Sequence, residues 1–450
     1  PGTRMIKLEQ NYRSTKVILE AASSVVTHNQ SRIGKTLWTQ NEEGESIDFF
    51  CAEDDLEEAH FVAESIAREG RAPRDFAVLY RTNAQSRLLE EALTRRGLPY
   101  LIIGGLRFYE RREVKDLLSY LRLIVNPDDE VSWKRIVNVP PREIGKSTVE
   151  TVEQIALREK LSLEVAARFS LEHSLLTPRG GRALQSFLDL LEALRAESEE
   201  GSPGDFLSRL IQRVGYREYL ERDNPQESES RLENVEELVA ALGECEGGTE
   251  GIREFLERIA LLSEVENVRG SEGVSLMTLH CAKGLEFPIV FLVGMEEHLF
   301  PHAHSRDEEA DVEEERRLCY VGMTRAKERL VLSRALSRRL FGRSQFNEAS
   351  RFLSEIPTHL LRDLSRRERT RLARPTERAL GFVPDLEAGE FQEDRGAGTY
   401  KLGKRVHHPE YGIGTIIGVE GSGDTLKLTI SFSVYGSKKF LPKYAPLEPI

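Results

Sequence analysis

Two spacings of apolar residues alternate along the first hundred residues of the chain. Apolar positions recur at helical spacing in three segments, which predicts helices at 14–26, 54–70 and 83–97. Short runs that are almost wholly apolar lie beside them and predict strands at 47–51, 76–81 and 99–103. Alternating strands and helices of this kind predict a parallel sheet that helices cover on both faces.

The strand pattern disappears between residues 107 and 270, where helical spacing dominates throughout. Strand-like runs then return at 274–280, 288–295 and 329–333. The fold class that these patterns predict is α/β, with one parallel-sheet domain that an all-α insertion domain interrupts.

The last hundred residues change character twice. Residues 357–398 are rich in Pro, Arg and Glu and have weak periodicity, which predicts a linker. Residues 399–450 contain short β-rich runs separated by Gly-containing turns, which predicts a small β-barrel. This segment has seven Lys and Arg against four acidic residues, a balance of +3, whereas the whole chain of 450 residues carries −12.

Composition narrows the class of protein. With 39% hydrophobic and 31% charged residues, the chain has enough apolar material for packed cores. It has no 18-residue apolar run, so no membrane span is predicted. Its four cysteines are far apart and form no C-x-x-C pair, which favours a reducing, cytoplasmic compartment. The net charge does not settle whether nucleic acid binds, because local basic stripes can bind phosphate.

Two short stretches imitate a phosphate-binding loop. REIGKST at 142–148 has the Gly-Lys-Ser ending, but Pro140 occupies the position of the first Gly and has no N–H to offer. SRIGKT at 31–36 has Asn29 at that position and follows a helical pattern instead of a strand. We interpret both as surface turns with a basic residue.

An aromatic–arginine pair, Tyr12 and Arg13 in NYRS, stands at a predicted strand-to-helix junction. A Tyr ring can stack on a base, and an Arg fork can bind two phosphate oxygens. By itself the pair is also compatible with a packed Tyr and a solvated Arg.

A second candidate site follows the predicted strand 274–280. Thr278, His280, Lys283 and Glu286 lie at or after its carboxyl end, which is where ligands bind in an open parallel sheet. The alternative interpretation of this stretch is a capped turn with a chance His.

Arg325 ends a helical pattern just before the final strand of the sheet. Arginine is the residue with which a neighbouring domain stabilises charge on a transferring phosphoryl group. The alternative is Glu–Arg pairing on a helix surface, each pair worth a few tenths of a kcal/mol.

A metal site is not predicted. The histidines near residue 300 (His298, His302 and His304) match no zinc template, and the acidic end of 47–55 is explained by a helix N-terminus.

Taken together, these segments resemble superfamily 1 DNA helicases of the UvrD/PcrA/Rep type, over nearly the whole chain. The resemblance is carried by LEQNYRS (8–14), YRTNAQSR (80–87), GGLRFYERREVKD (104–116), TLHCAKGLEF (278–287) and RRLCYVGMTRA (316–326). It implies a RecA-like domain 2A at 1–106 and 271–356, a helical 2B insertion at 107–270, and a Tudor-like (SH3-like) domain at 399–450.

The resemblance also implies residue roles. Tyr12 would stack on the adenine of ATP, Arg13 would reach the γ-phosphate, Glu286 would bond the ribose, and Arg325 would be a catalytic arginine finger. The single-strand DNA path would be lined by Arg81, Asn83, Thr278, His280 and His302.

In that family the Walker A loop and the Mg²⁺-binding acidic pair lie in a domain 1A that precedes the first motif found here. We therefore expect this sequence to be the C-terminal half of an ATP-dependent 3′–5′ DNA helicase acting in repair, inactive alone. The expected partners are single-stranded DNA and its junctions with duplex, the N-terminal helicase half, and RNA polymerase through 399–450. The expected location is the bacterial cytoplasm, on the nucleoid.

One departure concerns a turn of 2B that contacts duplex DNA in the family and usually reads Gly-Ile-Gly. Here it reads Glu143-Ile144-Gly145, so a carboxylate replaces the first Gly, which argues against tight duplex contact by this turn unless Arg142 and Lys146 compensate. Two other functions fit the sequence less well than the helicase. A non-enzymatic DNA- and polymerase-binding adaptor would not need both arginines, and a RecB- or AddA-like nuclease subunit would need a carboxylate cluster that is not found.

Overall fold

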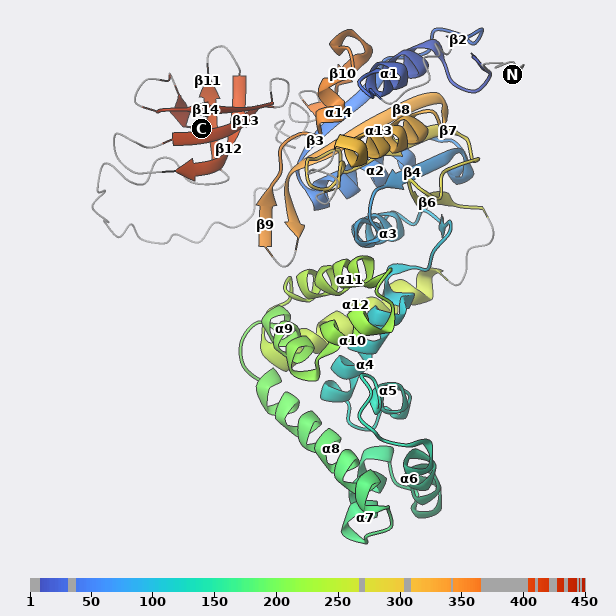
Figure 1. The fold of residues 1–450 in the computed structure, drawn as a ribbon, viewed down its shortest axis with the longest axis vertical. Helices are drawn as coiled ribbons and strands as arrows, with labels where there is room; N and C mark the ends of the chain where they lie inside the picture. Colours follow the sequence, from blue (N-terminus) through green and yellow to red (C-terminus); the bar gives the residue numbers. More distant parts are fainter. Residues whose placement is uncertain are drawn as a thin grey trace, which may run out of the picture.

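The computed structural model consists of a sheet region, a helical region and a separate antiparallel sheet (Figure 1). The residues that it describes are 9–30, 38–266, 272–302, 309–340, 343–365, 404–408, 412–420, 427–432, 436–442, 445 and 447–449. The predicted loop at 31–36, His304 and most of the predicted linker lie outside these residues.

An eight-stranded sheet forms the centre of the sheet region, and seven of its strands follow the order β10-β3-β8-β7-β4-β6-β5. All pairings along this path are parallel, whereas β9 adds to β8 as an antiparallel hairpin. The strands are β3 (Ile47–Asp54), β4 (Phe76–Tyr80), β5 (Tyr100–Ile102), β6 (Val274–Thr278), β7 (Phe287–Leu292), β8 (Ala326–Leu340), β9 (Arg343–Phe346) and β10 (Leu361–Asp363).

Helices cover both faces of this sheet. One face packs against α1 (Lys16–Thr27) and α13 (Glu309–Met323), and the other against α2 (Asp55–Glu69) and α3 (Ser86–Arg95). All five residues of β4 are buried, as expected for a strand with helices above and below it. The prediction of a parallel sheet covered on both faces is confirmed.

Two differences from the sequence prediction concern the edge of this sheet. β8 is far longer than the run 329–333, because it continues in parallel along β3 as far as Ser337 and its last four residues, 337–340, pair with β9. Residues 358–363, which were assigned to the linker, instead form a short 3₁₀ turn (Thr358–Leu360) and β10, which pairs with β3. A three-residue edge strand has too little periodicity to be found from sequence.

The described residues between β5 and β6 form helices and turns without a strand. Their core is built around large buried side chains such as Trp133, Phe187 and Tyr216. Besides the 3₁₀ turn Phe108–Glu110, the helices are α4 (Arg112–Val125), α5 (Glu130–Ile136), α6 (Lys146–Glu159), α7 (Leu163–Glu172), α8 (Pro178–Ser198), α9 (Pro203–Val214), α10 (Tyr216–Asp223), α11 (Ser228–Leu242) and α12 (Gly248–Glu266). None of the described helices is long and apolar enough to cross a membrane.

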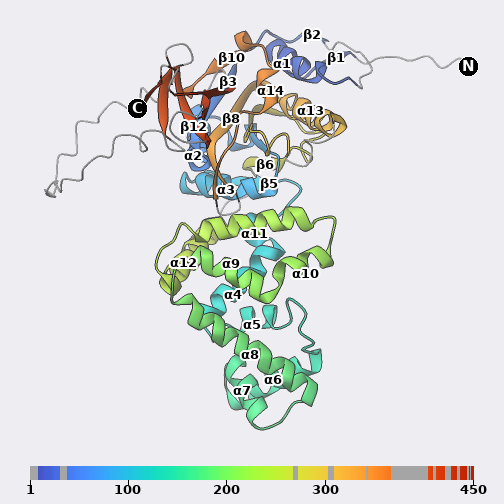
Figure 2. The ribbon, with the colours of Figure 1, turned by 60° about the vertical axis from the view of Figure 1, so that its left-hand side comes forward.

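The helical region extends away from the sheet region, and α11 lies closest to it (Figure 2). A buried arginine joins the two, because Arg87 of α3 donates to Glu237 of α11 at 2.6 Å and to Glu91 at 3.1 Å. A second arginine, Arg111 of the helical region, donates to the side chain of Asn234 at 2.7 Å and to the hydroxyl of Ser86 of α3 at 3.0 Å. Charged groups removed from water are stable only when they are paired, so these contacts fix how α11 sits on α3.

The C-terminal strands form an antiparallel sheet in the order β14-β13-β12-β11-β15. They are β11 (Arg405–His408), β12 (Gly412–Glu420), β13 (Lys427–Phe432), β14 (Gly436–Phe440) and β15 (Glu448–Pro449). One small apolar core supports them, formed by Val406, Ile416, Leu428, Ile430 and Leu447. Closure of this sheet into a barrel stays a prediction.

A buried charge cluster holds β8 against the rest of the sheet region. Arg338 of β8 is ion-paired with Glu58 of α2 and with Glu296, and all three side chains are buried. The backbone N–H groups of Gly294 and Ala335 donate to the same two carboxylates at 3.0 and 2.8 Å. Burial alone would raise the pKa of Glu296, but the charge of Arg338 holds it below its usual range.

We expect Arg338→Ala to lower the free energy of unfolding by about 3–5 kcal/mol, because it leaves two buried carboxylates without a cation. The neighbouring Arg339→Ala should cost less than about 0.5 kcal/mol, since that side chain is half exposed. Urea denaturation of both variants measures the difference. Equal losses would show that the buried cluster does not stabilise the fold.

Candidate functional site

Segments more than 270 residues apart meet at the amino edge of the parallel sheet. The hydroxyl of Ser14 donates to the carbonyl of Ala326 at 2.8 Å, and the N–H of Phe287 donates to the carbonyl of Arg325 at 3.0 Å. The segments that contain NYRS, KGLEF and MTRA are therefore adjacent in space.

Glu286 lies at the centre of this edge, where two cations hold its carboxylate. Arg13 donates from Nε to one oxygen at 2.7 Å, and Nζ of Lys327 contacts the other oxygen at 2.7 Å. The hydrogen bonds from Lys327 and Arg13 lower the pKa of Glu286 to about 2. Glu286 is thus ionised throughout the physiological range.

Arg325 is held differently, because its guanidinium contacts backbone carbonyls. Nε donates to the carbonyl of Val321 at 2.9 Å, and an Nη donates to the carbonyl of Leu285 at 3.1 Å. Burial, followed by the positive charge of Arg13, lowers the pKa of Arg325 to about 10. The group stays protonated at pH 7, and its charge is oriented without a carboxylate to neutralise it.

Next to these charges, Tyr12 presents an aromatic ring that is 78% exposed. Its hydroxyl donates to the side chain of Gln10 at 2.7 Å, which fixes one end of the ring. Three cations, one carboxylate and an open aromatic face therefore lie within the same few segments. This combination suits a ligand that has both polyphosphate and a base.

The position of Glu286 corrects the sequence prediction that grouped it with Thr278 and His280. Thr278 ends β6, whereas Glu286 directly precedes β7, and these strands are parallel. A parallel connection must cross from the carboxyl edge back to the amino edge. Residues 279–286 make that crossing, so Glu286 lies at the opposite edge from His280.

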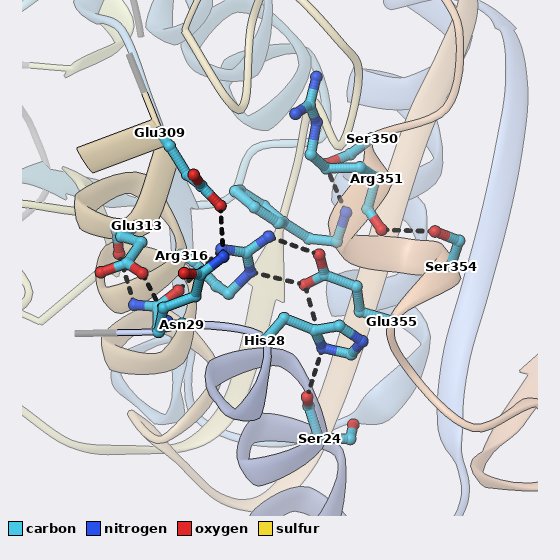
Figure 3. Close-up of polar contacts among 12 residues, drawn as sticks. Ser24, His28, Asn29, Glu309, Glu313, Arg316, Ser350, Arg351, Ser354 and Glu355 are labelled. Atoms are coloured by element: carbon cyan, nitrogen blue, oxygen red, sulfur yellow. Dashed lines mark hydrogen bonds and ion pairs between the residues drawn. The ribbon is translucent and has the colours of Figure 1, made fainter. Parts of the chain in front are cut away.

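Helix α1 follows Arg13 and helix α13 precedes Arg325, and the two helices pack antiparallel. Polar contacts join them at the end that lies away from these arginines (Figure 3). Arg316 of α13 donates to both oxygens of Glu355, at 2.9 and 2.7 Å, and to the side chain of Asn29 at 2.7 Å. Asn29 in turn donates to the carbonyl of Glu313 at 2.9 Å, and Nδ1 of His28 lies 3.9 Å from Glu355. This staple fixes α1 along α13 and thereby the position of Arg13 relative to Arg325.

At the carboxyl edge, the predicted DNA-path residues gather around one buried acid. Arg81 follows β4 and forms a two-pronged pair with Glu315 of α13, with distances of 2.8–3.1 Å. The backbone N–H of His302 donates to the same carboxylate at 3.3 Å. Thr278 is the last residue of β6, the strand next to β4, and His280 follows that strand. All five predicted residues, Asn83 included, therefore lie at this edge.

Two of these residues also contact the helical region through α11. The side chain of Asn83 donates to the hydroxyl of Ser230 at 3.4 Å, and Nε2 of His302 lies 3.3 Å from Glu233. The carboxyl edge is thus lined on one side by α11.

The turn at residues 143–145 precedes α6 and follows α5, so REIGKST does not have the strand–loop–helix context of a P-loop. Glu143 has φ 61°, the left-handed conformation that favours glycine, and pairs with Arg179 at 2.9 Å. Arg142 donates to carbonyls, including that of Ile136 at 2.8 Å, and packs over Phe187. The guanidinium of Arg142 is therefore bound within the helical region, whereas the side chain of Lys146 is 90% exposed.

Among the described residues, no group of three or more His, Cys, Asp or Glu side chains is arranged to hold a metal ion. His304 lies outside them, and the absence of a metal site stays a prediction.

Comparison with known proteins decides the family. A model of the UvrD-like helicase C-terminal domain matches residues 6–337, and a model of the PcrA/UvrD tudor domain matches residues 402–449. The chain belongs to the UvrD-like helicase C-terminal domain family.

Relatives of this UvrD-like chain are bacterial helicases. It is 42% identical to DNA helicase II of Escherichia coli (strain K12), 41% to the ATP-dependent DNA helicase PcrA of Staphylococcus aureus (strain MRSA252) and 40% to that of Bacillus subtilis (strain 168). Each comparison covers 100% of this chain but only 62–63% of the relative. The UvrD-like chain therefore spans less than two thirds of the length of these proteins.

A solved C-terminal domain of a possible DNA helicase from Lactobacillus plantarum WCFS1 covers 78% of the UvrD-like chain and 98% of its own chain. Its sequence identity is 12% and its TM-score is 0.29, which is too low to support an argument about the fold.

Sequence reasoning missed two partners in the UvrD-like chain. Glu315 lies in an acidic run that resembles a solvated helix face, yet its side chain is buried against Arg81. Lys327 follows the arginine motif directly and was not singled out, although it holds Glu286. Helical spacing could have shown that Glu315 shares a face with buried Cys319 four residues later.

The pKa of His280 provides a test of the carboxyl-edge arrangement in the UvrD-like chain. Burial lowers the pKa of His280, Arg81 lowers it further, and Glu315 raises it. We expect NMR titration to give a pKa below 6.5, which rises in Arg81→Ala and falls in Glu315→Gln.

Arg74→Ala is the matched control, because it removes an exposed arginine before the opposite end of the same strand, β4. It should leave the His280 titration unchanged. An unchanged pKa in Arg81→Ala would show that the two side chains are not close in solution.

Proposed function

We propose that this chain is the C-terminal half of an ATP-dependent 3′–5′ DNA helicase that acts in DNA repair. The observation that carries the proposal is the convergence of Arg13 and Arg325 at one edge of the sheet, beside Glu286 and the open ring of Tyr12. One loop could supply a chance arginine. Two loops that are 312 residues apart, joined by the hydrogen bonds of the Ser14 hydroxyl to Ala326 and of the Thr15 N–H to Lys327, support a built cationic site.

The proposed roles follow from the chemistry of each group. Tyr12 stacks on adenine, Glu286 bonds the ribose hydroxyls, Arg13 reaches the γ-phosphate, and Arg325 stabilises charge on it during transfer. The 450 residues contain no Walker A sequence. We therefore propose that residues outside this sequence cradle the phosphates and hold Mg²⁺, and that this chain alone does not turn over ATP.

The carboxyl-edge residues are proposed to contact single-stranded DNA. Thr278 and His280 offer polar groups, and Arg81 is a cation whose pairing with Glu315 lowers the cost of burying it. Contacts of this kind track the phosphate backbone, so binding should weaken as salt rises.

We also propose the domain division that the family resemblance implies. Residues 1–106 and 271–356 form 2A, with its edge extended to 363, and 107–270 form 2B. Residues 399–450 form a Tudor-like domain that binds RNA polymerase, a proposal supported by the match to the PcrA/UvrD tudor domain. Action on the nucleoid in a bacterial cytoplasm belongs to the same proposal.

The arginine roles can be tested by supplying the N-terminal half of a relative, such as PcrA of Bacillus subtilis, joined to this chain or in trans. With single-stranded DNA present, the pair should hydrolyse ATP. Arg13→Ala or Arg325→Ala should reduce turnover by about 10³–10⁵, because each variant lacks a positive charge that stabilises the transferring phosphoryl group. DNA affinity, measured by fluorescence anisotropy, should change little.

Arg317→Ala is the control, because it removes an exposed arginine of α13, the helix that leads to Arg325, where it pairs with Glu313 and Glu314. It should retain full turnover. Equal loss of DNA binding and turnover in Arg325→Ala would contradict the finger role, and DNA or polymerase binding without any turnover in the wild type would favour a non-enzymatic adaptor.

The turn at 143–145 generates a second test, on duplex binding by the helical region. Glu143 places an exposed carboxylate beside the N-terminus of α6, where a phosphate would otherwise bind. Glu143→Gln should raise duplex affinity about twofold to fivefold at low salt, and the gain should shrink as salt screens the charge.

Glu172→Gln, at the end of α7, removes a carboxylate elsewhere in the helical region and should leave duplex affinity unchanged. Anisotropy titrations at two salt concentrations measure both variants. No gain in Glu143→Gln would mean that duplex DNA does not approach this turn.

A further inference from the structure

Lys327 has no role in the function proposed above, yet it contacts the centre of the proposed nucleotide site. Its Nζ lies 2.7 Å from Oε1 of Glu286, while Nε of Arg13 lies 2.7 Å from Oε2 of the same carboxylate. The two cations therefore hold opposite oxygens of one group and do not compete for the same position.

The backbone of Lys327 is fixed by the same contacts that bring the two arginine loops together. Its carbonyl accepts a hydrogen bond from the N–H of Thr15 at 3.2 Å, and the hydroxyl of Ser14 is bonded to the preceding residue, Ala326. Because Lys327 is the second residue of β8, the strand that follows Arg325, its side chain is directed to Glu286 by the start of this strand. The contact is thus set by backbone register as well as by charge.

Arg13 faces a conflict in the proposed reaction. A guanidinium that binds the Glu286 carboxylate through Nε and the carbonyl of Thr324 through an Nη is not oriented towards a phosphate. Moving it to a phosphate oxygen would leave Glu286 ionised next to the negative charge of the nucleotide. Like charges at such a distance repel, so Arg13 could leave only at a cost.

We propose that Lys327 is a positioning residue that removes this cost. Its ammonium group balances the negative charge of the ionised Glu286 and keeps the carboxylate directed at the ribose, while Arg13 exchanges the carboxylate for a phosphate oxygen. This inference rests on the proposed function, because it assigns Lys327 to the same nucleotide site. Lys327 acts through Glu286 and is not assigned a contact with the transferring phosphoryl group.

The causes of the lowered pKa of Glu286 agree with this role. The hydrogen bond from Lys327 is the largest of them, ahead of the hydrogen bond from Arg13. Lys327 therefore remains as a charge partner of the carboxylate after Arg13 has left.

The first measurement uses the 450-residue chain without nucleotide. The side-chain carboxyl resonance of Glu286, assigned by its disappearance in Glu286→Gln, is titrated in the wild type and in Lys327→Ala. We expect the pKa of Glu286 to rise by about one unit or more in Lys327→Ala and to be restored in Lys327→Arg. No rise would overturn the inference whatever the fate of the proposed function.

The second measurement uses the pair with the supplied N-terminal half. Lys327→Ala should raise KM for ATP about threefold to fivefold, as expected for a partly exposed ion pair, and should reduce the preference for ATP over analogues that lack a ribose hydroxyl by a similar factor. In a Glu286→Gln background, the same change should have no further effect. A purely structural lysine would not alter ribose preference.

Lys16→Ala is the matched control, since it removes an exposed lysine at the start of α1 whose partner is Glu43 at 3.8 Å. It should leave both measurements unchanged. An active pair in which Lys327→Ala keeps wild-type KM and ribose preference would overturn the inference alone. A wild-type pair without turnover, with the Glu286 shift present, would overturn the proposed function and this use of Lys327 with it.

Discussion

The antiparallel contact between α1 and α13 is the constraint on which the candidate nucleotide site depends. At one end, Ser14 is bonded to the backbone just after Arg325, and at the other, Arg316 joins Glu355 and Asn29 in a largely buried network. Buried charges need complete pairing, so this staple has one favourable arrangement. Because both ends are fixed, the two arginines are held in place by packing that lies outside the site itself.

The same helix also connects the two edges of the sheet. Glu315 of α13 is paired with Arg81 at the carboxyl edge, while the end of α13 leads into Arg325 at the amino edge. Any shift of α13 along its axis must therefore change both groups of residues together. In the proposed helicase, this rigid element is a physical connection between nucleotide contacts and DNA contacts.

Electrostatics at the amino edge differs from that in the fold's interior. Arg338 is matched by carboxylates and serves stability, whereas Arg325 is matched by carbonyls and keeps an unneutralised charge. Carbonyl dipoles orient a guanidinium without cancelling it, which suits a group that must meet an anion supplied by a ligand. This difference distinguishes Arg338 from Arg325 on physical grounds.

The sequence by itself determined the class of the main elements, because helical and strand spacing are local properties: β4 and α2 lie where the apolar pattern predicts them, and the described residues between β5 and β6 are helical. It also identified Arg13 and Arg325 through their motifs. Only the tertiary structure decided that Glu286 lies at the opposite edge of the sheet from His280 and that Arg142 donates to backbone carbonyls. It also showed that Lys327 pairs with Glu286 and that Glu315 pairs with Arg81. Each of these depends on how parallel strands cross over and on contacts between residues far apart in the chain, which no local pattern records.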